Sequence, residues 1–413
     1  MWPVRLASTT FPQEKLIEVS IDTARSKPCI IMAIGALRGG GAERVVLNLI
    51  NHWPDDRYRP VLLLANRSGP YLADVKAGVE VLSCDVPFRA IDTPRALLRI
   101  GEIMKRLQPA AVFAHAIGTG RMLARARALG LLSAPLFMVL HANVRMWLED
   151  DRQRKMARWL LKRELGWMYS RADGVIAVSR GAAEELKSLF PGKISEVETI
   201  YNPIDLEQID AAVTSMPSDA FVSTFMGLPR PTVLTVGRLS PEKNQALLLR
   251  AYARLPQGSR GSLVILGEGD TRAQLESLAR ELGIESETHF PGFVPNPWWY
   301  MQRADLYVLP SRSEAYPMVL VEALACGLPV VATDCRHGPS EIIQSESFGT
   351  LVPVDDPQAL AVAMDRRLQS ANAGPRFRED IRAFLESYRP EKVAQRYDEL
   401  VFTRQGGYSA SLR

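Results

Sequence analysis

The sequence lacks the features that mark several large protein classes. Its 413 residues contain four scattered cysteines and no C-x-x-C pair, which argues against a disulfide framework or a zinc site and fits a reducing compartment. No apolar run approaches the roughly 20 residues that span a bilayer, and the first residues lack the apolar core of a signal peptide. We therefore expect a cytoplasmic protein.

Motifs of several enzyme classes are also missing. The glycine cluster at residues 35–44 has neither the G-x-G-x-x-G spacing of a dinucleotide fingerprint nor the Lys-Ser/Thr ending of a P-loop. The histidines form no H-E-x-x-H or other metal-binding spacing. No nucleophile elbow supports serine hydrolase chemistry. A nucleotide-related function therefore remains open, but one that uses neither the dinucleotide fingerprint nor the P-loop.

Charge is divided unevenly along the chain. Residues 1–200 hold 29 lysines and arginines against 20 acidic residues, whereas the remainder holds 21 against 26. Basic and apolar residues alternate in one predicted helix, which contains Arg145, Trp147, Arg152, Arg154, Lys155, Arg158, Trp159, Leu160, Leu161, Lys162 and Arg163. Two interpretations carry equal weight: this helix lies on an anionic membrane surface, or it is a solvated helix packed by its other side. A nucleic acid partner is not expected, because no recognition motif accompanies the basic residues.

Short apolar segments alternate with amphipathic ones along most of the chain. Strands are expected at residues 29–34, 60–64, 79–82, 111–114, 136–140, 174–178, 232–236, 262–266, 305–309 and 329–332, with another beginning at His289. Strands that alternate with helices predict parallel sheets covered on both faces. Ligands of such sheets bind at the carboxyl ends of the strands.

The alternating pattern also predicts a division into domains. Residues 1–27 form a polar extension, residues 28–210 a first domain and residues 211–231 a linker with three prolines and a glycine. A second domain covers residues 232–389. The last segment, residues 390–413, contains a helix over residues 390–402 that we expect to pack back on the first domain.

Two glutamates eight residues apart, Glu314 and Glu322, are the most informative pair in the chain. Glu314 follows an apolar strand, and Pro317 fits the first position of a helix that carries Glu322. No capping side chain precedes this helix, so its first-turn amides suit a bound phosphate. The two carboxylates can accept hydrogen bonds from a sugar and a ribose. An equally weighted alternative is a buried helix whose acidic residues favour the macrodipole.

Two cations, Arg238 and Lys243, follow the first strand of the second domain. A helix is expected over residues 241–255, with Ser240 as its N-cap and Lys243 in its first turn. Cations at this end oppose the helix dipole, so local stability does not explain them. A diphosphate bound between them does, and we prefer this interpretation to two solvated surface cations.

Three further features lie at strand ends. Three consecutive glycines, Gly39 to Gly41, exceed what a tight turn needs and favour a loop that approaches a ligand. His141 ends an apolar strand and is placed to touch a ligand, whereas His115, in a similar position, is interpreted as structural. Phe293 follows another strand and is placed to line or stack on a nucleobase.

Together these motifs resemble the family 4 retaining glycosyltransferases, which have the GT-B fold. The resemblance covers about residues 28–402. It is carried by Gly-Gly-Gly-Ala-Glu-Arg at 39–44, Asn-Pro-Ile-Asp at 202–205, Gly-Arg-Leu-Ser-Pro-Glu-Lys at 237–243, and the pair Glu314 and Glu322. It implies an α/β fold with two doubly wound Rossmann-like domains that face a central cleft. The second domain would bind the donor.

The resemblance also implies roles for the candidate residues. Arg238 and Lys243 would bind the donor diphosphate and support the departing β-phosphate. Glu314 would contact the donor sugar near the reacting centre, and Glu322 would bind the ribose. Such enzymes need no metal or other cofactor, because cations and a helix terminus take that role. The leaving nucleoside diphosphate would act as base, which gives retention by front-face attack.

The remaining donor contacts implied by the resemblance come from both domains. The backbone around Met318 and Val319 would reach the sugar and the phosphate. From the first domain, Gly40 and Gly41 would approach the donor, and His141 would hydrogen-bond the sugar.

Two positions depart from the usual pattern of the family. Ala315 stands where the family usually has glycine, and its methyl group would narrow the sugar pocket or alter the loop. The loop at residues 333–339 replaces the paired glycines of many relatives. This variant resembles the members that use UDP-N-acetylhexosamines for surface polysaccharides.

The resulting hypothesis is a glycosyltransferase that moves a hexose or N-acetylhexosamine from a nucleotide sugar, with UDP as the first choice. Its acceptor would be a lipid-linked or envelope glycan at the inner face of the cytoplasmic membrane, where the protein would be peripheral. The alternatives are a nucleotide-sugar epimerase on the same fold and a non-catalytic sugar-nucleotide-binding protein.

Overall fold

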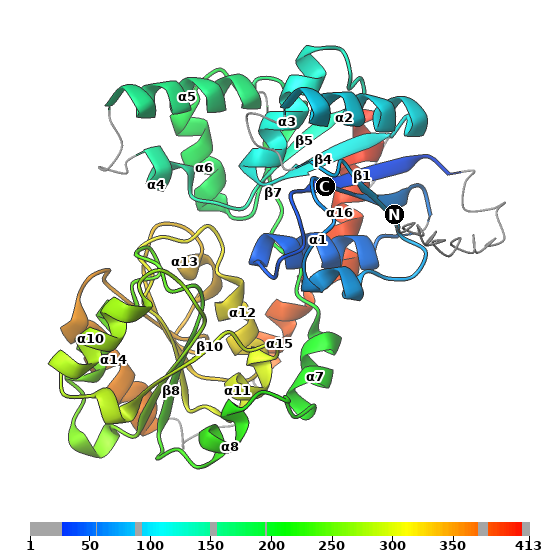
Figure 1. The fold of residues 1–413 in the computed structure, drawn as a ribbon. Helices are drawn as coiled ribbons and strands as arrows, with labels where there is room; N and C mark the ends of the chain where they lie inside the picture. Colours follow the sequence, from blue (N-terminus) through cyan, green and yellow to red (C-terminus); the bar gives the residue numbers. More distant parts are fainter. Residues whose placement is uncertain are drawn as a thin grey trace, which may run out of the picture.

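The computed structural model describes residues 27–54, 56–86, 93–148, 155–194, 196–370 and 379–406. It contains two parallel sheets, each with helices on both faces, arranged as two lobes (Figure 1). The predicted extension therefore lies, apart from Lys27, outside the described residues, as do Arg152 and Arg154 of the basic segment. No described helix has the length and apolar character that crossing a membrane requires.

The first sheet has the strand order β3-β2-β1-β4-β5-β6-β7. Its strands are β1 (Cys29–Ile34), β2 (Arg59–Leu64), β3 (Glu80–Ser83), β4 (Ala111–His115), β5 (Leu136–Leu140), β6 (Gly174–Ala177) and β7 (Val197–Thr199). Its helices are α1 (Gly41–Asn51), α2 (Thr93–Leu107), α3 (Ile117–Ala128), α4 (Val144–Leu148), α5 (Lys155–Tyr169) and α6 (Arg180–Leu189), with a 3-10 helix, η1 (Pro70–Asp74).

The second sheet has the strand order β10-β9-β8-β11-β12-β13. Its strands are β8 (Thr232–Val236), β9 (Ser262–Leu266), β10 (Thr288–Gly292), β11 (Leu306–Leu309), β12 (Val330–Thr333) and β13 (Thr350–Val352). Its helices are α7 (Leu206–Thr214), α8 (Phe221–Met226), α9 (Gln245–Tyr252), α10 (Arg272–Glu281), α11 (Pro297–Arg303), α12 (Met318–Ala325), α13 (Pro339–Ile342), α14 (Pro357–Ser370) and α15 (Glu379–Glu386).

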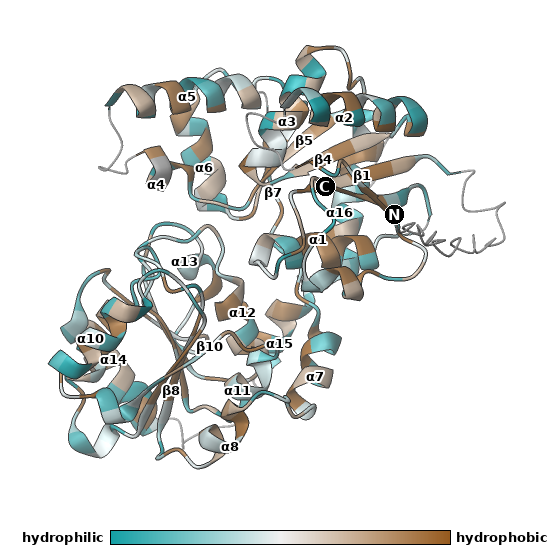
Figure 2. Ribbon diagram, in the orientation of Figure 1, coloured by the Kyte–Doolittle hydropathy of each residue, from teal (hydrophilic) through white to brown (hydrophobic). Residues whose placement is uncertain are grey.

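Each sheet is buried on both faces, which explains why its central strands are continuous apolar runs. In β1 every residue is buried, and alternate side chains enter two hydrophobic clusters, one on each face of the first sheet. The second sheet separates two further clusters in the same way. Figure 2 shows this as hydrophobic strands inside each lobe and more hydrophilic helices outside. The predicted α/β fold with two doubly wound domains is confirmed.

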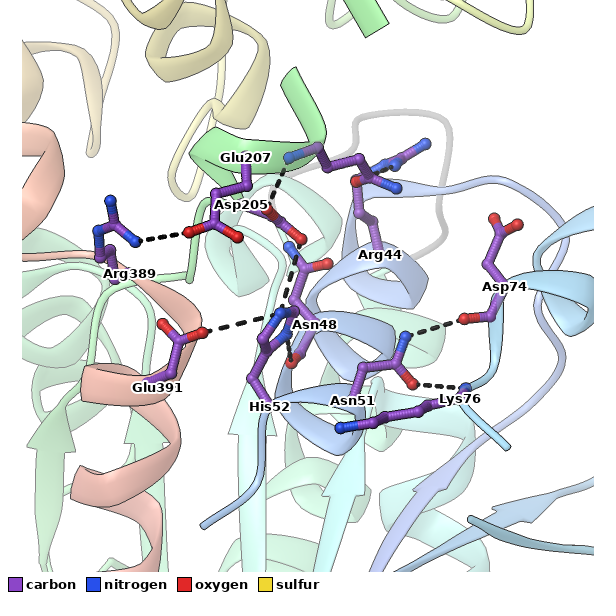
Figure 3. A network of polar contacts seen from close by, with 11 residues as sticks. Arg44, Asn48, Asn51, His52, Asp74, Lys76, Asp205, Glu207, Arg389 and Glu391 are labelled. Atoms are coloured by element: carbon purple, nitrogen blue, oxygen red, sulfur yellow. Dashed lines mark hydrogen bonds and ion pairs between the residues drawn. The ribbon is translucent and has the colours of Figure 1, made fainter. Parts of the chain in front are cut away.

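The chain crosses between the lobes twice, at neighbouring points. The amide of Ile204 on the first crossing donates to the carbonyl of Tyr388 on the second, at 2.9 Å. After the second crossing, α16 (Pro390–Arg404) packs against α1 of the first lobe. Beside the crossings, His52, which directly follows α1, lies 3.8 Å from Asp205 and 3.7 Å from Glu391, and Figure 3 shows these three residues. The two crossings thus lie side by side in one polar region, which we call the hinge.

Two local predictions were wrong. The helix expected from Ser240 and Pro241 begins four residues later, at Gln245. Asn244 adopts a left-handed conformation with φ 51°, which interrupts a helix, and its side chain donates to Asp355 at 3.0 Å. The basic segment was expected as one helix, and its described residues lie in two, α4 and α5.

Candidate functional site

Helix α12 begins without a side-chain cap. The helix begins at Met318, one residue after the predicted start, with Pro317 as its N-cap, and no side chain accepts from the first turn. The amide of Leu320 bonds to the Pro317 carbonyl at 3.0 Å. Among the described residues, the structure records no acceptor for the amides of Met318 and Val319, whose residues are half-buried. This leaves two N–H groups at the positive end of a helix, an arrangement that suits a phosphate.

Glu314 is held by a buried ion pair beside that helix. The Lys243 ammonium group lies 2.7 Å from Oε1 and 3.0 Å from Oε2 of Glu314. The Ser311 hydroxyl also donates to Oε1, at 2.7 Å, and Ser311 is itself fully buried. Ser311 was not identified from the sequence, because a lone serine after a strand carries no signal. The two carboxylate oxygens are therefore satisfied from one side by a cation and a hydroxyl.

Lys243 reaches Glu314 from the turn that precedes α9. The amide of Lys243 donates to the Ser240 carbonyl at 3.0 Å, which closes this turn. The helix-dipole argument for a diphosphate thus no longer applies to Lys243, since it lies before the helix begins. Arg238 is exposed at the end of β8, and no ion-pair partner is recorded for its guanidinium among the described residues. Both cations therefore follow β8 closely in the chain: Arg238 has no recorded ion-pair partner among the described residues, and Lys243 pairs with Glu314.

Glu322 is buried on α12 and faces the first domain. Burial raises the pKa of its carboxyl, and the charge of Arg44 opposes that rise. Like Arg44, the indole N–H of Trp298 lowers the pKa of Glu322. This N–H has no hydrogen-bond partner of standard geometry among the described residues. Arg44 belongs to α1, so a cation of the first domain partly compensates an acid of the second.

The glycine loop is organised by an acid in α1. The Glu43 carboxylate accepts from the amides of Gly39 at 2.7 Å and Gly40 at 3.1 Å. Gly39 has φ 107°, a conformation that glycine adopts without strain. No heavy atom lies within 4 Å of the position that a Cβ on Gly41 would occupy. The loop is thus fixed by its own helix while one of its faces remains open.

His141 pairs with His115, a contact that the sequence did not indicate. His115 Nδ1 lies 2.9 Å from His141 Nε2, and the other ring nitrogen of His115 lies 3.4 Å from the sulfur of Met32. Burial lowers the pKa of His141 to about 4 and holds that of His115 well below its usual range. Both imidazoles are therefore neutral at pH 7. The Nδ1 atom of His141 has no hydrogen-bond partner among the described residues.

Phe293 and Ala315 have contrasting environments. The Phe293 side chain is 63% exposed after β10, which leaves its ring free to contact a ligand. Ala315 is buried together with Tyr316 in the hydrophobic cluster under α12. Its methyl group therefore packs in the core of the second domain.

Direct contacts between the domains were not visible in the sequence. The Glu341 carboxylate at α13 accepts from the amides of Arg180 at 2.9 Å and Gly181 at 3.0 Å, at the start of α6. In the same region, His337 lies 3.1 Å from the buried Glu185 of α6. Figure 1 shows α13 on the side of the second lobe that faces the first. Because these contacts join residues about 150 positions apart, no local pattern reveals them.

Comparisons with known proteins cover both lobes. The sequence profile described as Glycosyltransferase Family 4 matches residues 39–208, and that described as Glycosyl transferases group 1 matches residues 223–384. A Campylobacter jejuni N-acetylgalactosamine-N,N'-diacetylbacillosaminyl-diphospho-undecaprenol 4-alpha-N-acetylgalactosaminyltransferase is 27% identical over 374 residues, which cover 88% of this chain and 96% of that protein. The lipopolysaccharide core biosynthesis glycosyltransferase LpsD of Rhizobium meliloti is 26% identical, with coverage of 88% and 93%.

A solved structure matches the arrangement of both lobes. The crystal structure of Anabaena HepE in complex with UDP-glucose superimposes with a TM-score of 0.74 at 20% identity, and the match covers 91% of this chain and 99% of HepE. This likeness establishes the GT-B fold. The two profile matches and the full-length relatives show that the chain is a glycosyltransferase and belongs to family 4.

Proposed function

We propose that this enzyme transfers a hexose or N-acetylhexosamine, with retention of configuration, from a UDP-sugar to a lipid-linked or envelope glycan. One observation carries the donor assignment: Lys243 pairs with Glu314, which lies just before the uncapped first turn of α12 in the chain. In this proposal Arg238, Lys243 and the amides of Met318 and Val319 bind the diphosphate. Charge-assisted hydrogen bonds of this kind stabilise the phosphate charge that develops as the sugar leaves.

The two glutamates then occupy opposite ends of the donor. Glu314 contacts the sugar near its reacting carbon, and Glu322 accepts hydrogen bonds from the ribose hydroxyls. His141, neutral and paired with His115, hydrogen-bonds the sugar from the first domain. Gly40 and Gly41 approach the same region. The departing nucleoside diphosphate takes the proton of the acceptor hydroxyl on the face from which it leaves.

The acceptor assignment rests on relatives and on the charge of the first domain. The two full-length relatives act, by their names, on an undecaprenyl-diphosphate-linked saccharide and in lipopolysaccharide core synthesis. Helix α5 exposes three large apolar side chains among exposed cations: Met156 at 65%, Trp159 at 51% and Leu160 at 54%, with Lys155, Lys162 and Arg163. A helix of this kind binds anionic bilayers by apolar insertion and charge.

The donor is tested first by thermal unfolding of the protein with UDP-, GDP- and ADP-sugars, because a ligand that binds only the folded state raises its melting temperature. We expect stabilisation by UDP-sugars, and stabilisation by none of the three would refute the donor assignment. Incubation with donor alone and then with an undecaprenyl-diphosphate saccharide separates transfer from the alternatives. An epimerase converts the donor without acceptor, and a binding protein leaves both unchanged.

The membrane assignment is tested by sedimentation with phosphatidylglycerol vesicles at low salt. Trp159→Glu combined with Leu160→Glu should abolish binding, whereas Met226→Glu should not. Met226 is a suitable control because it is 63% exposed on α8 of the second domain. Wild-type protein that stays in the supernatant would exclude the proposed membrane surface.

A further inference from the structure

Arg44 of α1 lies between aromatic rings of the two domains. Its guanidinium carbon is 4.4 Å from the ring centroid of Tyr71 in η1 and 4.9 Å from that of Trp298 in α11. Trp298 is buried, with 6% of its surface exposed. A guanidinium over an aromatic face is attracted by the negative charge of the ring face. Arg44 is therefore a point of contact between the lobes and not a solvated surface cation.

Hydrogen bonds fix the Arg44 side chain in this position. One terminal nitrogen donates to the Tyr71 hydroxyl, and the other donates to Oε1 of Gln208 at 3.2 Å. The Tyr71 hydroxyl in turn lies 3.5 Å from the carbonyl oxygen of Gly39, in the glycine loop. The loop, Tyr71 and Arg44 thus form a continuous series of contacts that ends at Trp298.

The Asn-Pro-Ile-Asp motif helps to place the partner of Arg44. Asp205 ends this motif and is the N-cap of α7, where its side chain accepts from the Gln208 amide at 2.8 Å. This cap sets the first turn of α7, from which Gln208 reaches Arg44. Figure 3 shows Arg44 and Asp205 on facing elements at the hinge. Through Asp205, the motif therefore contributes to the position of Gln208 and so of Arg44.

The charge of Arg44 also acts on Glu322. Several titratable groups influence or border this carboxyl: Arg44, Tyr71, Tyr307, Cys326 and, through Cys326, Asp210. Burial raises the pKa values of Tyr71, Tyr307 and Cys326, so these groups are neutral at pH 7. Arg44 is the cation in this group and opposes the effect of burial on the Glu322 pKa.

We propose that Arg44 is a positioning residue for donor binding, which pins the glycine loop of the first domain to Trp298 and Glu322 of the second. This inference rests on the proposed function, in which Glu322 accepts the ribose hydroxyls. Arg44 itself touches no donor atom in this scheme. It sets the distance between the glycine loop of the first domain and α12 of the second. It also supplies the counter-charge for the Glu322 carboxylate, which binds the ribose in this scheme.

The test measures the Kd of UDP by calorimetry between pH 5.5 and 8 in the wild-type protein and in variants. Arg44→Gln should weaken UDP binding by about tenfold at pH 7, the loss expected for one partly buried cation–π contact. Protonation removes the charge of Glu322 and turns one of its acceptor oxygens into a donor, so Kd rises as pH falls. In Arg44→Gln this rise should begin at a higher pH, because the charge that lowers the Glu322 pKa is gone.

Three companion variants make the result decisive. Arg44→Lys keeps the charge and should keep the wild-type pH profile, while Arg67→Gln, at an exposed arginine of the same domain, should change nothing. In a Glu322→Gln background, Arg44→Gln should cost less than in the wild type. An unshifted pH profile in Arg44→Gln, or equal effects in both backgrounds, would overturn the inference. If the wild-type protein binds no UDP, the proposed function fails instead, and thermal unfolding of each variant verifies that it is folded.

Discussion

Lys243 and Glu314 form a bidentate ion pair at the centre of the proposed donor site, with Nζ 2.7 Å and 3.0 Å from the two carboxylate oxygens. Glu314 is 8% exposed, so its charge is largely removed from water. A diphosphate would compete for the same ammonium group. The pair therefore both stabilises the site without donor and provides a cation that phosphate oxygens can share.

Replacing Lys243 with methionine should leave a buried carboxylate without its cation. Because breaking a buried ion pair by removing one partner is strongly destabilising, we expect the free energy of unfolding at pH 7 to fall by about 2–3 kcal/mol. Urea unfolding measures this change. The double variant Lys243→Met with Glu314→Gln should recover most of the loss, since neither charge then remains. A double variant as unstable as the single one would show that the pair is not coupled as described.

Glu314→Gln tests the role of the acid in transfer. The amide keeps the shape of the side chain but removes the charge, so we expect kcat to fall by about 10²–10³-fold, as for loss of one electrostatic contact to a transition state. UDP affinity should change little, because this residue faces the sugar. Glu242→Gln, in the turn beside Lys243, is the matched control and should retain activity. Unchanged turnover in Glu314→Gln would refute the assignment.

The central strands could be predicted from the sequence because they are buried on both faces, whereas the half-buried β7 and β13 were missed. The apolar runs at 29–34, 136–140, 232–236 and 262–266 coincide with β1, β5, β8 and β9. Burial of both faces requires a run of apolar residues with polar residues at its ends, and this pattern is local. The same local pattern predicted that Glu314 precedes a helix and that Glu322 lies on it, as α12 shows.

The rest depends on contacts between distant residues. Asn244 interrupts a helix that Ser240 and Pro241 would otherwise begin, and its side chain bonds to Asp355, 111 positions away. The cations of the donor site were found, but Lys243 was placed in a helix instead of an ion pair with Glu314. From the sequence, His115 was interpreted as a separate structural residue. No local pattern shows that β4 and β5 bring it into contact with His141. The roles of these residues in donor binding remain predictions.

The pair of His141, which is half-buried, and His115, which is buried, predicts a loss of stability in acid. Burial places the pKa of His141 at about 4 in the folded protein, below the value of 6.5 for an exposed histidine. The unfolded chain therefore binds the extra proton first, and stability falls as pH decreases from 6.5 towards 4. For His141 alone this amounts to at most about 3 kcal/mol. His141→Gln should lose less stability than the wild type between pH 7.5 and 4.5, as urea unfolding can measure. Parallel losses in both proteins would contradict this account.

Glu341 predicts a link between the domains that does not involve the donor. Its carboxylate accepts from the amides of Arg180 and Gly181 and from the Tyr201 hydroxyl at 2.7 Å, so an acid of the second domain occupies the N-terminal end of a helix in the first. Such a carboxylate satisfies amides that the helix leaves unpaired and favours its dipole. Glu341→Ala should therefore free the start of α6 and loosen the contact between the lobes.

Hydrogen exchange should detect this change directly, with faster exchange at Arg180 and Gly181 in Glu341→Ala while the strands of both sheets are unaffected. We also expect kcat/KM to fall by about tenfold, because a looser contact lowers the population in which the two walls of the site face each other correctly. Glu346→Ala is the control, since Glu346 is exposed and pairs with Arg367 within the second domain. If the α6 amides exchange at the wild-type rate in Glu341→Ala, this carboxylate does not hold the domains together, and the hinge and Arg44 must do so without it.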